Sequence, residues 1–502
     1  MSNVMCEIFQ EFERNDIKYL HFKSNTALKS SFDGRGDFDV LVDSSRVSEI
    51  EHIISTHNGK RFNPSRLGRY PGVDNWMIFD ENSGILYHLH LHYQLATGKA
   101  LVKDYIIPWK DVLFDTRIKD STYDIYITDP SLEILLLLSR TVVKSTWKQR
   151  LKARFGKFYM PKSMKEEFKD LKSRFSSDAF YVFAEKCSLS KADADVFAGV
   201  IEKGTIDAKS FKRLSRVVRR YLKPYRRMSG FAASVLSFYY SFRRTAATVI
   251  KNRTEKTRMI KKIHDTNGLI VAFIGVDGAG KSTVTKEIYK WLNKKIECKR
   301  FYMGSGDGRI PLSTRILNGF KKSKSKKNPN SDHKVVKIQT VSLFKNPVKY
   351  YRRVFKMRAL YDVQKKNYKN ICRMQRYRLN GGISLLDRYP QIEYSGMNDG
   401  PKIVEYRDTF ASKRWIDRMI KKENKKLGIV KKIKPDIIFR LNITAETSMS
   451  RKPEQKNIDL FRRKIEDLNK ISFQGARIID IDAEQPYESE LLEIKKILWS
   501  LM

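Results

Sequence analysis

One segment constrains the fold of this chain more than any other. In LIVAFIGVDGAGKSTVTKEIYKWL, an apolar run leads through a glycine-rich loop into an amphipathic stretch. The loop from Gly275 to Ser282 fits GxxxxGK followed by Ser or Thr, with a strand before it and a helix after it. Its glycines let successive N–H groups and the helix N-terminus converge on phosphates. We expect Lys281 to reach the β- and γ-phosphates of a nucleotide and the Ser282 hydroxyl to ligate Mg²⁺. An ordinary glycine-rich turn is the alternative.

The alternation of apolar and amphipathic segments continues to the end of the chain. From residue 265 onward, runs typical of buried parallel strands are separated by helical segments; the runs are LIVAFIGV, GISLLD, DIIFRLNI and ARIIDID. This pattern predicts an α/β domain over residues 265–502, with βαβ units around a parallel sheet.

A carboxylate and a guanidinium follow the second of these runs. The segment GGISLLDRYP ends its apolar part in Asp387 and Arg388. The carboxyl ends of parallel strands open onto the ligand crevice, so we expect both side chains to face the nucleotide. Asp387 can then hold Mg²⁺ or accept a proton from the attacking group, and Arg388 can fork onto a phosphate. A surface turn is the alternative.

Together these motifs resemble the thymidylate kinase family of nucleoside-monophosphate kinases. The resemblance rests on GVDGAGKST, LLDRYP, KPDIIFRLNI with the helix that reaches Arg451, and ARIIDIDAEQP. It covers about residues 267–502. It implies a doubly wound phosphate-loop kinase domain that transfers the γ-phosphoryl group of ATP, with Mg²⁺, to a nucleoside monophosphate such as dTMP.

The resemblance also implies roles for particular residues. The implied catalytic residues are Lys281, Asp387, Arg388 and Arg451. The implied metal ligands are Ser282 and Asp387. Asp277 is placed to touch the acceptor. Some family members carry an arginine where this chain has Gly278, so Arg451, in a lid segment with Lys452 and Lys456, becomes the candidate to meet the transition-state charge. The residues assigned to the nucleotide are Gly275, Asp277, Gly278, Ala279, Gly280, Lys281, Ser282 and Thr283.

The acceptor is specified less well. After the Asp-Arg-Tyr motif the family usually continues with a segment that seats thymine, whereas this chain reads PQIEYSGMNDGPKI. Residues 309–386 carry 21 Lys and Arg against two acids, with Arg358, Arg373 and Arg376 as candidates for an acceptor site. Two alternatives to a thymidylate kinase follow. One is a kinase of another acceptor, such as a sugar or glycan intermediate, and the other is a nucleotide-gated protein that binds a membrane or an acidic polymer.

Residues 1–128 predict a separate α+β domain, because short β-branched and aromatic runs alternate there with a few amphipathic stretches. In FDGRGDFDVLVD, alternation places Asp37 and Asp39 on one face of a strand. With Ser24 upstream, this arrangement resembles the nucleotidyltransferase superfamily that has a DNA polymerase β-like palm. The resemblance covers about residues 1–101.

Three histidines stand where that superfamily has a third carboxylate. In GILYHLHLHYQL, a period of two places His88, His90 and His92 on one strand face. Imidazole suits Mn²⁺ and Zn²⁺ better than Mg²⁺, so we expect these histidines and the two aspartates to hold a second divalent metal. The alternatives are a degenerate domain that only binds substrate, and histidines hydrogen-bonded on a wet sheet face.

The charge balance implies an anionic partner, because 99 Lys and Arg against 56 Asp and Glu give a formal net charge of +43. Residues 129–264 predict a basic helical connector. Its segment RLSRVVRRYLKPYRRMSGFAASVLSFYYSFRR brackets uncharged residues with arginines, as do helices that adhere to anionic membrane surfaces. The same residues suit an acidic polymer, although no nucleic-acid-binding module is recognisable. A core helix packed between the two domains is the alternative.

Four scattered cysteines exclude a disulfide scaffold and a CxxC metal site. The N-terminus lacks the apolar stretch of a secretory signal, and no run reaches the ~20 apolar residues that cross a bilayer. We therefore expect a cytoplasmic protein, with peripheral membrane attachment as the second interpretation.

Overall fold

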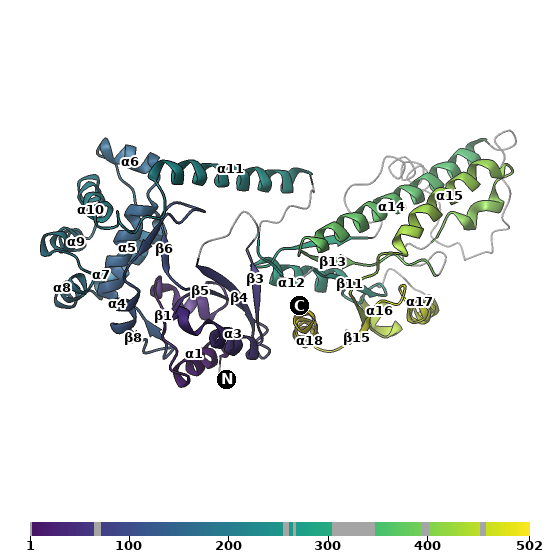
Figure 1. The fold of residues 1–502 in the computed structure, drawn as a ribbon. Coiled ribbons are helices and arrows are strands. Elements are labelled where there is room, and N and C mark those ends of the chain that lie inside the picture. The colour runs from purple at the N-terminus through teal and green to yellow at the C-terminus, as the bar shows by residue number, and fades with distance from the viewer. Residues whose placement is uncertain are drawn as a thin grey trace. The chain divides into compact units, whose positions relative to one another are not determined.

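The structure is a computed structural model that describes residues 3–64, 72–254, 261–264, 268–303, 347–393, 401–451 and 458–502. The chain forms two compact units, Met1–Asp265 and Thr266–Met502, which are described separately below (Figure 1). The sequence suggests separate domains at 1–128 and 129–264, and the structure places both ranges in the first unit.

The first unit is built on an eight-stranded mixed sheet in the order β10-β3-β4-β5-β2-β1-β9-β8. β2 and β5 at its centre are parallel, in the register Asp39 to His90. β4 runs antiparallel to β5. The strands are β1 Tyr19–His21, β2 Phe38–Val42, β3 Gly59–Asn63, β4 Val73–Phe79, β5 Leu86–His92, β8 Ile118–Lys119, β9 Tyr126–Ile127 and β10 Ile263–His264; β6 Leu95–Thr97 and β7 Tyr105–Ile107 form a separate hairpin.

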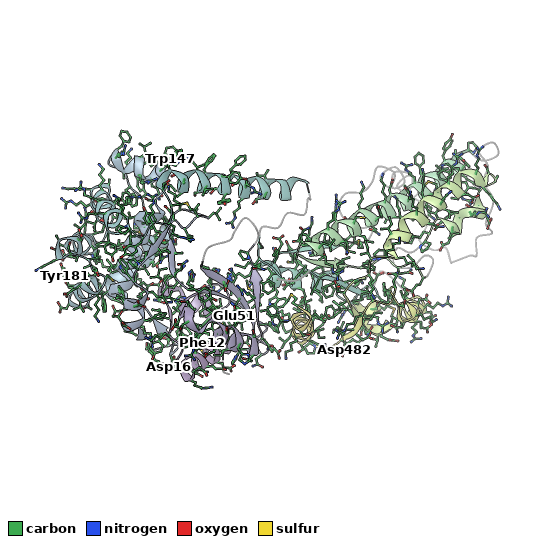
Figure 2. The ribbon with its side chains drawn as sticks, viewed as in Figure 1. Phe12, Asp16, Glu51, Trp147, Tyr181 and Asp482 are labelled. Carbon is green, nitrogen blue, oxygen red and sulfur yellow. The ribbon has the colours of Figure 1, made fainter. Side chains whose placement is uncertain are left out.

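Short helices bury an aromatic cluster against this sheet. Phe9 and Phe12 of α1 are fully buried with Phe38 of β2. The ring of Phe9 stacks on that of Tyr19 at a centroid distance of 5.0 Å. The amphipathic stretches predicted for this region therefore supply one side of the core (Figure 2). The helices are α1 Val4–Arg14, α2 Leu28–Phe32, α3 Val47–Thr56 and α4 Lys110–Asp115.

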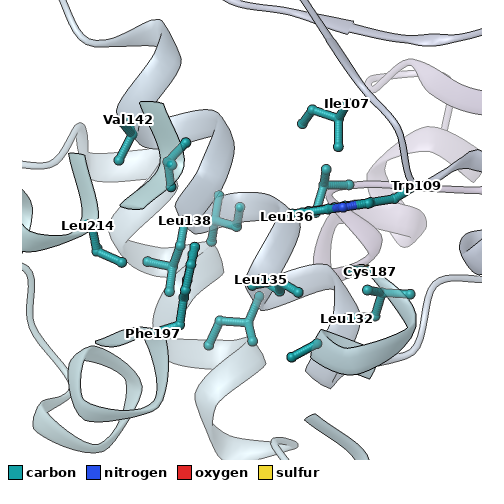
Figure 3. Packing of buried hydrophobic residues seen from close by; sticks show 14 of the residues in the cluster. Ile107, Trp109, Leu132, Leu135, Leu136, Leu138, Val142, Cys187, Phe197 and Leu214 are labelled. Atoms are coloured by element: carbon teal, nitrogen blue, oxygen red, sulfur yellow. The ribbon is translucent and has the colours of Figure 1, made fainter. Parts of the chain in front are cut away.

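A buried helix, α5 Pro130–Lys144, is the centre of the second core of this unit. Asp129 caps it by accepting the N–H of Ser131 at 2.8 Å, and Pro130 occupies its first turn. Its leucines face side chains from the hairpin and from the surrounding helices (Figure 3). This packing joins the helical region to the sheet region in one unit. The surrounding helices are α6 Trp147–Arg154, α7 Lys162–Ser173, α8 Ser177–Lys186, α9 Lys191–Lys203 and α10 Ala208–Tyr221.

Truncating one of these leucines tests the α5 core. Leu135 is fully buried, so we expect Leu135→Ala to lower the free energy of unfolding by about 2–5 kcal/mol, the cost of reduced burial plus a cavity. Urea titration followed by the fluorescence of the tryptophans, one of which, Trp109, lies in this core, measures the change. The matched control is Leu151→Ala on α6, whose side chain is 43% exposed. Equal unfolding curves for the two variants would contradict the assigned core.

The basic connector segment forms two helices with different surroundings. α10 buries Phe211, Leu214 and Val218 against the α5 core. A break follows at Pro224, and α11 Gly230–Thr254 begins beyond it. On α11, Phe231, Phe238 and Phe242 are 82%, 75% and 64% exposed. α10 is therefore a core helix within the first unit and not one packed between two domains, whereas three aromatic rings of α11 are exposed.

The second unit is an α/β fold with a five-stranded sheet in the order β12-β13-β11-β14-β15. All four pairings are parallel, which confirms the predicted βαβ architecture around a parallel sheet. β11 lies in the middle, with strands added in both directions from it. The strands are β11 Ile270–Gly275, β12 Cys298–Tyr302, β13 Ile383–Asp387, β14 Ile437–Asn442 and β15 Ile478–Asp482. The helices are α12 Lys281–Asn293, α14 Pro347–Leu379, α15 Lys413–Val430, α16 Ala445–Arg451, α17 Ile458–Lys470 and α18 Tyr487–Leu501.

Candidate functional site

The glycine-rich loop joins β11 to α12 with the geometry that its sequence predicts. Gly278 and Gly280 have φ values of +94° and +79°, a region that favours glycine. A Cβ atom at Gly278 would lie 3.2 Å from the Ser448 carbonyl oxygen, so a side chain there would also crowd the backbone of α16. Gly280 is the N-cap of α12, and Lys281 begins the helix. The N–H groups of the first helical turn therefore lie at the carboxyl edge of the sheet, as in anion-binding loops.

Lys281 lies over this loop instead of extending into solvent. Its side chain is 7% exposed, and Nζ donates a hydrogen bond to the Val276 carbonyl oxygen at 2.6 Å. Its charge is therefore held against the loop in which a phosphate would lie. Thr283 is exposed in the first turn of the same helix.

Asp387 and Ser282 meet beside the loop. Asp387 is the last residue of β13, opposite Phe273 of β11 in the parallel register. The Ser282 hydroxyl donates to Oδ2 of Asp387. The carboxylate is 2% exposed, and its Oδ1 is buried without a hydrogen-bond partner among the described residues. A buried carboxylate oxygen in that state fits a bound cation, so these two residues suit Mg²⁺.

Asp277 and Arg388 are brought together across the loop. Nη2 of Arg388 lies 3.3 Å from Oδ1 of Asp277, and the backbone of Arg388 is left-handed with φ +73°. Lys464 of α17 approaches Oδ2 of the same carboxylate at 3.7 Å. The Ser448 hydroxyl donates to the Asp277 carbonyl oxygen at 2.5 Å. Asp277 is therefore held between two cations.

Arg451 contacts the loop from α16. Nη1 donates to the Gly278 carbonyl oxygen at 3.2 Å, and Nη2 donates to that of Ala483 at 3.3 Å. The structure thus places this predicted catalytic arginine against the loop. Lys452 and Lys456, the other predicted lid cations, lie outside the described residues.

The predicted acceptor arginines lie along α14. Arg358 is 60% exposed and approaches Asp362 one turn away at 3.9 Å. Arg376 is also exposed, whereas Arg373 is half-buried. Asn367 of the same helix donates to the Met303 carbonyl oxygen at 3.1 Å, which ties α14 to the carboxyl end of β12. The basic stretch KKSKSKKNPN lies outside the described residues.

In the first unit, Asp39 of β2 and the three histidines of β5 lie on adjacent strands, and Asp37 directly precedes β2. Nδ1 of His88 is 2.7 Å from Oδ1 of Asp37. Nδ1 of His90 and Nε2 of His92 are 3.2 and 3.0 Å from Oδ1 of Asp39. The side chains form two groups with the spacing of metal ligands: Asp37, His88 and His90, and Asp39, His90 and His92. Ser24, also predicted for this site, approaches Glu167 of α7 at 3.4 Å instead.

The electrostatics of this cluster keep its ligand atoms in the forms that bind metals. Burial lowers the pKa of His92 to about 3 and that of His88 well below its usual range, so both imidazoles are neutral. Burial alone would raise the pKa of Asp39, but Lys23 at 2.9 Å and the two imidazoles hold it well below its usual range. A neutral imidazole and an ionised carboxylate are the ligating forms. The nucleotidyltransferase resemblance stays a prediction.

Several residues near these two sites were not predicted from the sequence. Ser448 and Lys464 escape detection because they lie more than 160 residues after the loop that they contact. In the first unit, Lys103, Arg140 and Lys144 line the same cavity as Asp39. Arg140 and Lys144 could have been recognised from the sequence, because they interrupt the apolar run LLLLSRTVVK and lie four residues apart, on one face of a helix.

The fold and the loop define the second unit as a phosphate-loop α/β domain. No family model matches the chain. It is 32% identical over 232 residues to the "Uncharacterized ATP-binding protein YghR" of Escherichia coli K12, which covers 45% of this chain and 84% of that protein. It is also 25% identical over 248 residues to the "Uncharacterized ATP-binding protein YghS" of the same strain, covering 47% and 94%. The chain belongs to the family of YghR.

Two solved structures of deoxyadenosine kinase from M. mycoides also match. The complex with dATP is 17% identical with a TM-score of 0.27, and covers 46% of this chain and 99% of the kinase chain. The complex with the products dCMP and dCDP is 14% identical with a TM-score of 0.28. At such scores, the function has to be argued from the chain's own residues.

No helix among the described residues combines the length and the apolar character needed to cross a membrane.

Proposed function

We propose that the second unit binds ATP with Mg²⁺ and transfers the γ-phosphoryl group to a small acceptor. The observation that carries the proposal is the buried Asp387 carboxylate, which bonds to Ser282 with one oxygen and leaves the other without a partner among the described residues. This pair lies at the first turn of the helix that follows the phosphate loop. The names of the two E. coli relatives, both ATP-binding proteins, support the nucleotide.

Each polar group then has a distinct part. Lys281 and the loop N–H groups bind the phosphates, and Ser282 and Asp387 hold the metal ion, which would neutralise charge on the phosphate oxygens. Arg388 and Arg451 flank the loop, where they can stabilise the charge that develops during transfer. The Asp277 carboxylate, held between cations, is positioned to orient the acceptor.

For the acceptor, we propose a nucleoside monophosphate such as dTMP, with a phosphorylated sugar or glycan intermediate as the alternative. The first rests on the kinase-like motifs. The second is favoured by the basic surface of α14, whose arginines Arg358 and Arg376 are exposed in the same unit. Positive charge of this kind suits a glycan intermediate that carries more negative charge than a mononucleotide.

A panel of acceptors incubated with ATP labelled at the γ-phosphate tests the proposal. The panel holds the common nucleoside monophosphates, sugar phosphates and a water-only control, each with the full chain and Mg²⁺. Transfer of label to one class identifies the acceptor. Release of labelled phosphate at the same rate with and without every acceptor would contradict a kinase and support a nucleotide-gated binding protein.

We also propose that α11 docks on an anionic membrane surface. Its exposed apolar side chains Phe231, Val235, Phe238 and Phe242 recur at intervals of four, three and four residues, so they share one helix face. The exposed Arg227, Arg243 and Arg244 flank them. An apolar face with basic flanks is how a helix lies in the headgroup region.

The choice of arginines for a test follows from their contacts. Arg219 donates to the Val142 carbonyl oxygen, and Arg220 and Arg226 pair with Asp193 and Asp104. These three side chains are engaged within the unit, so replacing them would also disturb its packing. The exposed arginines are the better targets.

Reversing the exposed charges is expected to weaken binding to anionic vesicles. At about 1 kcal/mol per basic residue, Arg227→Glu/Arg243→Glu/Arg244→Glu should reduce the affinity roughly 100-fold or more. Vesicle flotation at low and high salt measures it. The charge-matched control replaces Lys162, Lys165 and Lys169 of α7 by glutamate. Equal binding to neutral and anionic vesicles, or none at low salt, would contradict the membrane proposal.

A further inference from the structure

The first unit contains a cavity of about 200 Å³ that the proposed function does not use. Asp39 of β2 and His90 and His92 of β5 form part of its lining. Helix α5 contributes Leu136 and Arg140. The cavity thus lies between the sheet and the buried helix of a single unit.

Basic groups outnumber acidic groups in this lining. Among the described residues of the lining, four basic side chains, Lys23, Lys103, Arg140 and Lys144, stand against one carboxylate, that of Asp39. Lys23 lies 2.9 Å from Asp39, and this ion pair offsets one positive charge. Burial, together with the neighbouring cations, lowers the pKa of Lys103 to about 8 and that of Lys144 to about 6. An anion bound among these groups would relieve their repulsion.

The guanidinium of Arg140 has an N–H group that can still donate a hydrogen bond. Arg140 is 8% exposed, and its Nη1 is buried without a hydrogen-bond partner among the described residues. Such a group is unfavourable unless an acceptor completes it. Lys144 follows four residues later on α5, so both side chains leave the same face of the helix. A guanidinium beside a lysine amine, whose protonated form a bound anion would favour, suits the several oxygens of a phosphate.

The other side of the cavity carries metal ligands. Oδ1 of Asp39 lies 3.2 Å from Nδ1 of His90 and 3.0 Å from Nε2 of His92. Two imidazoles and one carboxylate are a donor set for Mn²⁺, Fe²⁺ or Zn²⁺. The second group, with Asp37 and His88, shares His90 with the first. The group around Asp39 is favoured because all three of its members line the cavity.

We propose that this cavity binds one divalent transition-metal ion together with the phosphate group of a small molecule. Asp39, His90 and His92 hold the metal, and the phosphate lies between the metal and the side chains of Arg140 and Lys144. The volume of about 200 Å³ admits a phosphate group. It is below the roughly 300 Å³ at which pockets for whole drug-sized ligands begin. The rest of the ligand therefore extends beyond the cavity.

The test uses the full chain with Lys281→Ala, which weakens phosphate binding at the loop of the second unit. The amount of free Mn²⁺ is followed by electron paramagnetic resonance during titration, without and with inorganic phosphate. Compared with this parent, we expect Asp39→Asn and His92→Gln each to lower Mn²⁺ affinity at least about tenfold. Arg140→Gln should keep the Mn²⁺ affinity and abolish its increase by phosphate.

Matched variants and a second anion complete the experiment. His52→Gln on the exposed face of α3 and Arg213→Gln on the exposed face of α10 should behave like the parent. Unchanged Mn²⁺ affinity in Asp39→Asn or in a folded His92→Gln variant overturns the metal site. A phosphate effect that persists in Arg140→Gln overturns the anion site. An equal effect of acetate overturns the assignment to phosphate. Because the parent already lacks Lys281, none of these results depends on the kinase proposal.

Discussion

Replacing Lys281 by alanine is expected to lower phosphoryl transfer from ATP by about 1,000-fold, because one positive charge no longer stabilises the phosphoryl-transfer transition state. The ammonium group lies over the phosphate loop, where it donates to the Val276 carbonyl oxygen, an acceptor that a phosphate oxygen can replace. Alanine removes the charge and leaves the glycine geometry of the loop unchanged. The transfer of label from γ-labelled ATP measures the decrease in rate.

The fold should survive this change. Lys281 opens α12, and alanine is a good helix former at that position. Circular dichroism and the thermal midpoint should therefore match those of the parent. The matched control is Lys286→Ala, an exposed lysine of the same helix, which should keep full activity. Undiminished transfer by Lys281→Ala would remove the basis of the kinase proposal.

Local patterns in the sequence predicted much of the second unit. The apolar runs around Ile270, Ile383 and Ile437 became β11, β13 and β14, because strands inside a parallel sheet are covered on both faces and are therefore largely apolar. The run at Ile478 became the edge strand β15, in which Asp480 and Asp482 are exposed. The turn between Gly275 and Lys281 was predictable for a similar reason, since only glycine adopts its backbone readily. A strand or turn that requires particular residue types can therefore be recognised from a short stretch of sequence.

The strand β12 escaped prediction for the opposite reason. Its sequence, CKRFY, carries Lys299 and Arg300 beside buried Cys298 and Phe301. It lies at the edge of the sheet, paired only with β13 among the described strands, so it tolerates charged side chains. An edge strand of this kind does not show the continuous apolar run of a central one.

Contacts between segments that are distant in the chain were also not predicted from the sequence. Period-two alternation aligned the aspartates and the histidines separately, but only the pairing of β2 with β5 brings Asp39 to His90. Arg140 and Lys144 come to the same cavity from α5, about 100 residues from Asp39 in the chain. Alternation fixes the face on which a side chain lies, whereas the partner of that face depends on topology.

The second large effect is expected from Asp387→Asn, which should slow phosphoryl transfer by about 100-fold or more while ATP binding stays measurable. The amide keeps the shape of the side chain and can still accept a hydrogen bond from Ser282. It removes the negative charge from a buried position whose Oδ1 has no protein partner among the described residues. The effect should therefore fall on Mg²⁺ binding and on kcat. Titration of the rate with Mg²⁺ should show a higher metal requirement than in the parent.

The position of Asp387 on the central part of the sheet provides the control for this substitution. Asp482 also ends a strand of the same sheet. Its strand, β15, lies at the edge opposite β12, and the Asp482 side chain is exposed (Figure 2). Asp482→Asn also removes one negative charge from the carboxyl end of a strand, and it does not alter the contact between Asp387 and Ser282. If any negative charge at the carboxyl ends of the strands were sufficient for activity, Asp387→Asn and Asp482→Asn would lower the rate equally. We expect Asp482→Asn to retain the parent's rate, and an undiminished rate in Asp387→Asn would show that this carboxylate does not hold the metal.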